Sequence, residues 1–266
     1  MTSAAGPYTA GVDIGAAQAK VAVIAADGQL VGWSIARSGT DFAGSATRGY
    51  DVALGNAGLS ERDVARVFSC GYGRKNVPFA HDSRTEIAAH AAGAYHHFPQ
   101  ALTIIDIGGQ DNKIIKVNKD GIRTGFKMNR KCAAGTGAFL EEMALRLDLP
   151  LEELDNMAAS AEKEASLGAF CTVFTATEVL AKIREGVPVE NLVKGLFASV
   201  VKRVKEMDLV AGLVVMTGGV AAHNPFLVKM LSEDLGVEVK TPPHPQLTGA
   251  WGAALLARKD LLPEAA

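Results

Sequence analysis

The sequence has 266 residues, of which 48% are hydrophobic and 21% are charged, and its formal net charge is -2 at pH 7. These values indicate a globular protein with a substantial core, and they exclude the strongly basic field of nucleic-acid-binding proteins. The first residues carry neither a cationic nor an apolar stretch, and no segment approaches the roughly 18 apolar residues of a membrane span. We therefore expect a cytoplasmic protein that binds neither nucleic acid nor membrane.

Two stretches of the sequence share one pattern of predicted elements. Each has a buried strand that ends in Asp-Ile-Gly, a second strand, an Asp-Gly turn and a third strand, and the two aspartates, Asp13 and Asp106, are 93 residues apart. The predicted strands cover residues 8–14, 20–26 and 30–36 in the first copy, and 102–107, 113–117 and 122–128 in the second. This duplication predicts an α/β protein with two similar lobes and a cleft between them.

The other predicted elements lie between and after the two copies. They are a helix over 45–57, a strand over 65–69 and a helix over 83–97, and then helices over 138–147 and 151–161, helices from 175 and from 188, a strand over 213–216 and a closing helix over 246–258. We predict a first lobe over residues 1–100, on which the closing helix, about 247–260, packs back. The second lobe, 101–266, would contain a helical insert.

The strand ends of the two copies are suited to phosphate binding. A strand that ends in Asp-Ile-Gly and turns at once offers backbone N–H groups to phosphate oxygens, while its carboxylate can hold a hydrated metal ion. Further glycines follow a strand at Gly218 and Gly219 and open the closing helix at Gly249, where a purine and ribose could approach the backbone. Neither a Walker loop nor a dinucleotide fingerprint occurs.

The cysteines have individual settings. Cys132 follows two cations and stands directly before a predicted helix, and Cys171 stands just ahead of another, an arrangement that favours the thiolate. A thiolate can bind a metal or attack an electrophile, and both roles are open at this point. An odd number of cysteines in a reducing compartment argues against disulfides, and Cys70 is expected to be a small buried apolar residue.

These motifs together resemble a known superfamily and, within it, one family. The two Asp-Ile-Gly turns, Thr217-Gly218-Gly219 and the Gly249-Ala250 run are similar to the acetate kinase, sugar kinase, Hsp70 and actin superfamily, whose lobes are ribonuclease H-like. The more specific resemblance is to the family of 2-hydroxyacyl-CoA dehydratase activators and ATP-dependent benzoyl-CoA reductase ATPase subunits. It is carried by Gly71-Tyr72-Gly73-Arg74, Asp106 to Asp111, Lys131 to Gly137 and Cys171 to Phe174.

The resemblance implies a duplicated, actin-like ATPase fold with a nucleotide cleft and a site for ATP with Mg²⁺. Asp13 and Asp106 would position the metal with its waters, and Gln110 would orient the attacking water. The implied cofactor-binding residues are Gly15, Ala16, Lys20, Gly108, Gly109, Gly135, Thr136, Gly137, Gly218, Gly219 and Gly249. Many relatives have Ser or Thr just after the first Asp-Ile-Gly, whereas alanines stand here, so backbone amides must serve.

The resemblance also implies that Cys132 and Cys171 ligate one 4Fe-4S cluster per dimer, shared with a second copy or a paralogous subunit. Four thiolates would equally suit a structural zinc ion. Such a protein hydrolyses ATP to drive low-potential one-electron transfer to an iron-sulfur acyl-CoA reductase or dehydratase component, with a donor such as ferredoxin. The alanine-rich first loop favours a benzoyl-CoA reductase subunit over a dehydratase activator.

Two other function classes fit the same frame. A sugar or small-hydroxyl kinase would need an acceptor pocket with a catalytic aspartate and would leave both cysteine motifs unexplained. A non-catalytic nucleotide-dependent switch or scaffold would bind ATP without redox activity.

Overall fold

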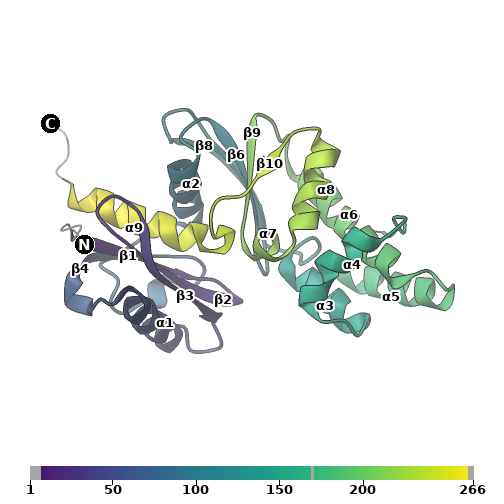
Figure 1. The fold of residues 1–266 in the computed structure, drawn as a ribbon, viewed down its shortest axis with the longest axis horizontal. Coiled ribbons are helices and arrows are strands. Elements are labelled where there is room, and N and C mark those ends of the chain that lie inside the picture. The colour runs from purple at the N-terminus through teal and green to yellow at the C-terminus, as the bar shows by residue number, and fades with distance from the viewer. Residues whose placement is uncertain (1–6, 169–170, 263–266) are drawn as a thin grey trace. The chain divides into compact units, whose positions relative to one another are not determined.

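The computed structural model describes residues 7–168 and 171–262, and these residues form two compact units (Figure 1). Unit 1 comprises residues 1–100, 117–123 and 247–266, and unit 2 comprises 101–116 and 124–246. The outermost residues of the two predicted lobes, 1–6 and 263–266, lie outside the described residues.

Unit 1 is built on a five-stranded sheet in the order β3-β2-β1-β4-β5. β1 runs antiparallel to β2 and parallel to β4. The strands are β1 (Tyr8–Ile14), β2 (Gln18–Ile24), β3 (Leu30–Arg37), β4 (Val64–Cys70) and β5 (Asp82–Ser83), and the helices are α1 (Phe42–Ala57), α2 (Glu86–His97) and α9 (Thr248–Leu261). Both predicted strand-to-strand connections of the first copy are therefore present.

Unit 2 has the same sheet with a larger helical layer. Its strand order is β10-β9-β6-β7-β8, which matches unit 1 strand for strand when it is read from β8, and β6 runs parallel to β9. The strands are β6 (Leu102–Ile107), β7 (Asn112–Val117), β8 (Arg123–Asn129), β9 (Leu213–Thr217) and β10 (Val239–Lys240), and the helices are α3 (Gly137–Arg146), α4 (Leu154–Ser160), α5 (Thr172–Arg184), α6 (Val189–Met207), α7 (Gly219–His223) and α8 (Pro225–Leu235). The predicted α/β class and its duplication are confirmed.

The closing helix α9 forms part of the core of unit 1. It packs on β1 and on α2, and its Ala250, Trp251 and Ala254 are buried against Ala22 and Ile24 of β2. The buried indole N–H of Trp251 donates to the carbonyl of Gly28, 3.0 Å away, so this large aromatic leaves no unpaired donor.

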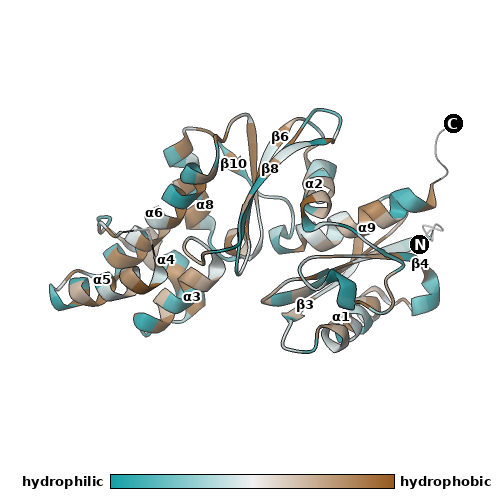
Figure 2. Ribbon diagram, turned by 180° about the vertical axis from the view of Figure 1, so that it is seen from behind, coloured by the Kyte–Doolittle hydropathy of each residue, from teal (hydrophilic) through white to brown (hydrophobic). Residues whose placement is uncertain are grey.

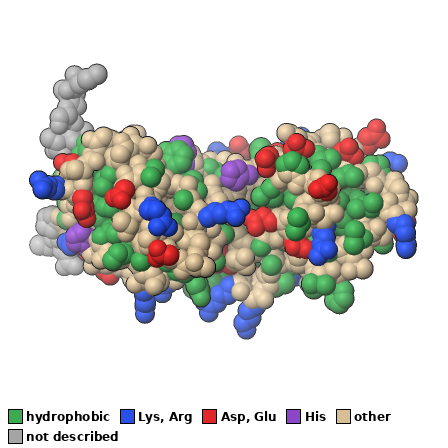
Figure 3. All heavy atoms as spheres, turned by 90° about the horizontal axis from the view of Figure 1, so that it is seen from below, with side chains coloured by type: hydrophobic (Ala, Val, Ile, Leu, Met, Phe, Trp, Pro, Cys, Tyr) green, Lys and Arg blue, Asp and Glu red, His purple; other side chains and the backbone are tan. Residues whose placement is uncertain are grey.

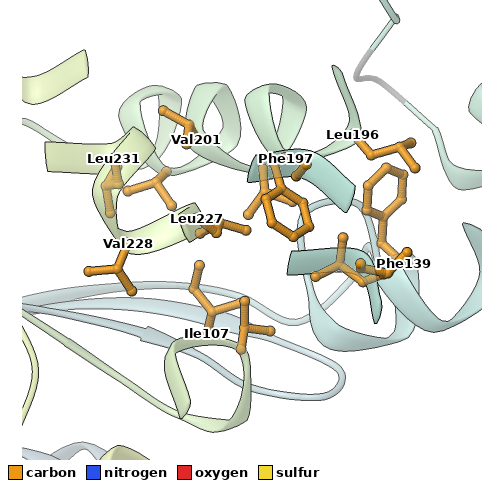
Figure 4. Packing of buried hydrophobic residues seen from close by; sticks show 14 of the residues in the cluster. Ile107, Phe139, Leu196, Phe197, Val201, Leu227, Val228 and Leu231 are labelled. Atoms are coloured by element: carbon orange, nitrogen blue, oxygen red, sulfur yellow. The ribbon is translucent and has the colours of Figure 1, made fainter. Parts of the chain in front are cut away.

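The core of unit 2 lies between its sheet and its helices. Figure 4 shows Phe139 of α3 pointing toward Leu196 and Phe197 of α6, with Leu227 of α8 and Ile107 of β6 closing the cluster. The helices carry alternating hydrophobic and hydrophilic residues, as Figure 2 shows for α8, so each presents one apolar face to this core. The strand that ends in the second Asp-Ile-Gly is thereby fixed by packing from the helical layer.

Some predicted element boundaries were wrong. The helix predicted over 83–97 begins at Glu86, because Ser83 belongs to β5 and Thr85 caps the helix by accepting from the N–H of Ala88. The helix predicted over 151–161 is a 3-10 turn at Leu151–Glu153 followed by α4. Among the described residues, β5, α7, α8 and β10 were not predicted.

Charged side chains of both signs are interspersed over the face shown in Figure 3, in keeping with the small net charge. Along residues 7–168 and 171–262, none of the helices combines the length and the apolar character that crossing a bilayer requires.

Candidate functional site

In unit 1, Asp13 lies at the carboxyl end of the central strand β1 and is almost completely buried. Its Oδ2 atom lies 3.3 Å from the Nζ of Lys20, which faces it across the β1–β2 ladder. Its Oδ1 atom is buried and has no hydrogen-bond partner among the described residues. A buried carboxylate oxygen without a donor is costly, and a bound, hydrated cation would satisfy it.

In unit 2, Asp106 occupies the corresponding position at the end of β6. Its Oδ2 atom lies 2.9 Å from the Nζ of Lys113, and its Oδ1 accepts a hydrogen bond of 2.8 Å from the hydroxyl of Thr217. Lys113 also contacts Asp111, with 2.7 Å between Nζ and Oδ1, and its side chain is completely buried. One ammonium group therefore pairs with two carboxylates in this turn.

Lys113 and Thr217, which both contact Asp106, were not among the site residues predicted from the sequence. Lys113 follows Asp106 by seven residues, as Lys20 follows Asp13, so the internal repeat that identified the aspartates also contains the signal for Lys113. Thr217 pairs with Asp106 in the β6–β9 register just as Cys70 pairs with Asp13 in the β1–β4 register. No local motif marks Thr217, because its role follows from strand pairing.

The two predicted phosphate turns have the same internal closure. The N–H of Gly15 donates to the carbonyl of Gln18 at 3.0 Å, and the N–H of Gly108 donates to the carbonyl of Asp111 at 2.9 Å. These two amides close their own turns, so a phosphate would be bound by the amides that follow them, beginning at Ala16 and at Gly109. Gln110 is exposed on the second turn.

Two of the glycines predicted to contact adenosine, Gly218 and Gly219, lie at the end of β9. Gly218 has a φ of 94°, and a Cβ there would come within 2.3 Å of the carbonyl oxygen of Ile107, so only glycine fits without strain. Gly219 begins the short helix α7. Gly249 lies in unit 1, where a Cβ would be 2.9 Å from Nε2 of His90 and 3.1 Å from Oδ2 of Asp13.

The loop that follows Cys132 differs from the prediction. The helix α3 begins at Gly137, and Thr136, not Cys132, is its N-cap residue. The reason is a turn in which Thr136 donates to the carbonyl of Ala133 through its N–H at 3.0 Å and its hydroxyl at 2.6 Å. Cys132 is half-buried and precedes this turn, so it does not lie at the helix N-terminus.

The start of α3 is joined to the second phosphate turn. The N–H of Gly137 donates to the carbonyl of Gly108 at 2.9 Å, and the N–H of Ala138 donates to the carbonyl of Gly109 at 2.8 Å. Gly135, Thr136 and Gly137, which were predicted as cofactor-binding residues, thus connect Cys132 with the Asp106 turn.

Cys171 is itself the N-cap residue of α5, which begins at Thr172 rather than near Thr175. The hydroxyl of Thr175 donates to the carbonyls of Gly168 at 2.8 Å and Cys171 at 2.9 Å, while Oε2 of Glu178 accepts from the N–H of Gly168 at 2.6 Å. Cys171 is half-buried, like Cys132. Its position is therefore set by side chains of the helix that it begins.

Cys70 is fully buried, as predicted, and its thiol lies 3.5 Å from the carbonyl of Gly249. Burial raises the pKa of the Cys70 thiol well above its ordinary value, and the nearby Asp13 carboxylate raises it further. A buried neutral thiol is a poor nucleophile and metal ligand, which separates Cys70 chemically from the two half-buried cysteines.

Comparison with known proteins places these motifs in a family. The model of the BadF/BadG/BcrA/BcrD ATPase family matches residues 10–257. The activator of lactoyl-CoA dehydratase from Anaerotignum propionicum is 42% identical over 254 residues, covering 94% of this chain and 97% of that protein. A benzoyl-CoA reductase subunit from Thauera aromatica is 29% identical over 260 residues, covering 93% of this chain and 92% of that protein.

Solved structures give the same result for the fold. Component A of the (R)-2-hydroxyglutaryl-CoA dehydratase from Acidaminococcus fermentans superposes with a TM-score of 0.91 at 37% identity, covering 96% of this chain and 99% of that one. The activator of the 2-hydroxyisocaproyl-CoA dehydratase from Clostridium difficile, solved with bound ADPNP, gives 0.87 at 36% identity, covering 97% and 100%. The chain thus has the predicted actin-like ATPase fold.

Proposed function

Because the chain belongs to the BadF/BadG/BcrA/BcrD ATPase family, we propose that it is an ATP-hydrolysing activator that delivers single electrons to a 2-hydroxyacyl-CoA dehydratase. The proposal has three parts: a site for ATP with Mg²⁺ at the two aspartate turns, a 4Fe-4S cluster at Cys132 and Cys171, and a connection between them.

Asp13 and Asp106 are proposed to hold the waters of the magnesium ion. The orphaned Oδ1 of Asp13 supports this, because it is a buried acceptor that a metal-bound water would satisfy. The amides that follow Gly15 and Gly108 would bind phosphate oxygens, and Lys20 would offset their charge. Gln110, which is exposed beside the second turn, would orient the attacking water.

Cys132 and Cys171 are proposed as the cluster ligands, since both residues are half-buried, whereas Cys70 is fully buried. One chain supplies two of the four thiolates that a 4Fe-4S cluster needs, so a second chain would supply the others. Exposed apolar side chains beside Cys171, Val173 at 70% and Phe174 at 75% exposure, favour a partner at this surface. When bound, the cluster supplies one-electron redox chemistry.

The observation that carries the proposal is the pair of hydrogen bonds from Gly137 and Ala138 to the carbonyls of Gly108 and Gly109. They tie the chain segment after Cys132 to the turn that would bind phosphate. A change in that turn on ATP binding or hydrolysis would therefore displace the segment that holds a cluster ligand.

Relatedness favours a dehydratase partner over the reductase partner that the alanine-rich first loop suggested. Three dehydratase activators are 38–42% identical to this chain, whereas the benzoyl-CoA reductase subunit is 29% identical. We therefore take the activator role as the proposed function. The alanines at Ala16 and its neighbours are then a sequence difference in the first loop that does not indicate a reductase partner.

Anaerobic purification tests the proposal. We expect a brown dimer that hydrolyses ATP and, with a chemical reductant or reduced ferredoxin, activates a 2-hydroxyacyl-CoA dehydratase but not the substrate-binding component of a benzoyl-CoA reductase. Cys132→Ser and Cys171→Ser should be colourless, whereas Cys70→Ala, the matched control, should stay brown. A colourless wild-type protein that contains zinc, or a brown protein that activates no dehydratase, would contradict the proposal.

A further inference from the structure

Asn112 joins the Asp106 turn to the Cys132 loop through its side chain. It is the first residue of β7, it is buried, and its Nδ2 donates to the carbonyl of Gly135 at 2.8 Å. We propose that Asn112 is a positioning residue that transmits the nucleotide state of the Asp106 turn to the loop carrying Cys132. This inference rests on the proposed function and specifies how its two sites communicate.

The loop from Cys132 to α3 is held at two places. At its end, Gly137 and Ala138 donate to the phosphate turn, and in its middle the carbonyl of Gly135 accepts from Asn112. Gly135 also packs against the side chain of Arg203, since a Cβ there would lie 3.0 Å from the arginine Cβ. The loop therefore follows the turn and the start of β7 rather than moving independently.

In the sequence, Asn112 lies between Asp111 and Lys113, whose charged side chains contact each other. Lys113 contacts both Asp106, at 2.9 Å, and Asp111, at 2.7 Å. A cation held near Asp106 would compete with the ammonium group of Lys113 and favour its contact with Asp111. Any such shift occurs in the residues on either side of Asn112, and in the proposed role it is passed through the backbone of β7 to the Asn112 amide.

The other end of the Asn112 amide supports a second arrangement. Its Oδ1 atom is buried and has no hydrogen-bond partner among the described residues. A buried asparagine that served packing alone would be expected to use both its donor and its acceptor. The Oδ1 atom of Asn112 could therefore accept a hydrogen bond from a backbone N–H of the loop after Cys132 when that loop moves.

Hydrogen exchange measured by mass spectrometry on the full chain, purified anaerobically, tests this role. Exchange is compared with and without Mg-ADPNP in the wild type, in Asn112→Ala and in Asn112→Leu, which keeps the branched shape of the side chain without its amide. Asn118→Ala is the matched control, because Asn118 also binds backbone, accepting from the N–H groups of Asp120 and Ile122 at the other end of β7.

In the wild type, nucleotide should slow exchange over residues 130–138 by about threefold to tenfold, the range expected when one or two hydrogen bonds are stabilised. Both Asn112 variants should lose this response while nucleotide still protects residues 14–19 and ATP hydrolysis stays within about twofold of the wild type. ATP-dependent activation of a dehydratase should fall with the lost response. Asn118→Ala should behave as the wild type.

A purely structural role for Asn112 would speed exchange equally with and without nucleotide, and that result would overturn the inference. It is also overturned if the wild-type loop ignores nucleotide while residues 14–19 are protected, an outcome that leaves the ATPase intact. A wild type that shows neither protection at 14–19 nor ATP hydrolysis removes the proposed function itself.

Discussion

Lys113→Met would remove a fully buried ammonium group from between Asp106 and Asp111. The side chain of Asp106 is only 3% exposed, so water cannot replace the lost cation there, while Asp111 is 24% exposed and partly screened. Removing one partner of a buried ion pair costs about 3–5 kcal/mol, because the remaining charge is left uncompensated. We expect a loss of that size in the free energy of unfolding.

The internal repeat supplies a matched control in Lys20→Met. Lys20 contacts Asp13 at 3.3 Å, a longer distance than either contact of Lys113, and its side chain is 16% exposed, so we expect a smaller loss of about 1.5–3 kcal/mol, the value of a hydrogen bond to a charged group. The two substitutions remove the same chemical group from equivalent strand positions. Their difference therefore measures how the second carboxylate and complete burial add to the cost.

Urea unfolding provides the measurement, with one probe for each unit. Both tryptophans, Trp33 and Trp251, belong to unit 1, so their fluorescence follows Lys20→Met, whereas circular dichroism at 222 nm also follows the helices of unit 2. The midpoint should fall at an unchanged slope if only stability is affected. Equal losses in the two variants, or a loss below about 1 kcal/mol for Lys113→Met, would refute the argument.

Further predictions concern unit 1. Gly252→Ala should destabilise it by more than about 3 kcal/mol, because the new Cβ would lie 1.8 Å from the carbonyl of Ala89, whereas Gly55→Ala, with open space around it, should stabilise it by about 0.5–1 kcal/mol in the same urea assay. Burial, with a smaller effect of the neighbouring histidine, lowers the pKa of His97 to about 4 from 6.5. The unfolded chain therefore binds a proton between these values that the folded chain does not, and unit 1 should lose about 1–2 kcal/mol as the pH falls from about 6.5 to about 4, a figure reduced for the partial exposure of the ring. His97→Phe should flatten this dependence in tryptophan fluorescence, and an unchanged slope would contradict the assignment.

Much of the sheet structure could be predicted because the same pattern of strands and turns occurs twice in the sequence. Apolar runs that end in Asp-Ile-Gly fixed β1 and β6 to the residue, and the Asp-Gly turns located the strands that follow. The helical layer of unit 2 was less predictable. α7 has only five residues, too few for a helical period to emerge, and it is followed almost at once by α8.

The site was predicted where it depends on short motifs and missed where it depends on pairing between distant strands. Asp13 and Asp106 were visible as strand ends, whereas the contact of Thr217 with Asp106 requires the β6–β9 register. The position of Cys132 was misjudged because Thr136 and Ala133 close a turn before the helix starts, and a side-chain hydrogen bond of this kind leaves no periodic signal. Burial of Lys113 between two carboxylates likewise follows only from the fold.

The place of α9 in unit 1 has a consequence for the order in which the protein can be made. β1, near the N-terminus, buries Gly11 so closely against Ala250 that a Cβ would lie 1.9 Å from the alanine carbonyl. The helix that covers this strand is synthesised after all the strands and helices of unit 2. The surface of the unit 1 sheet on which α9 packs therefore stays uncovered until α9 has been made, long after the strands of that sheet.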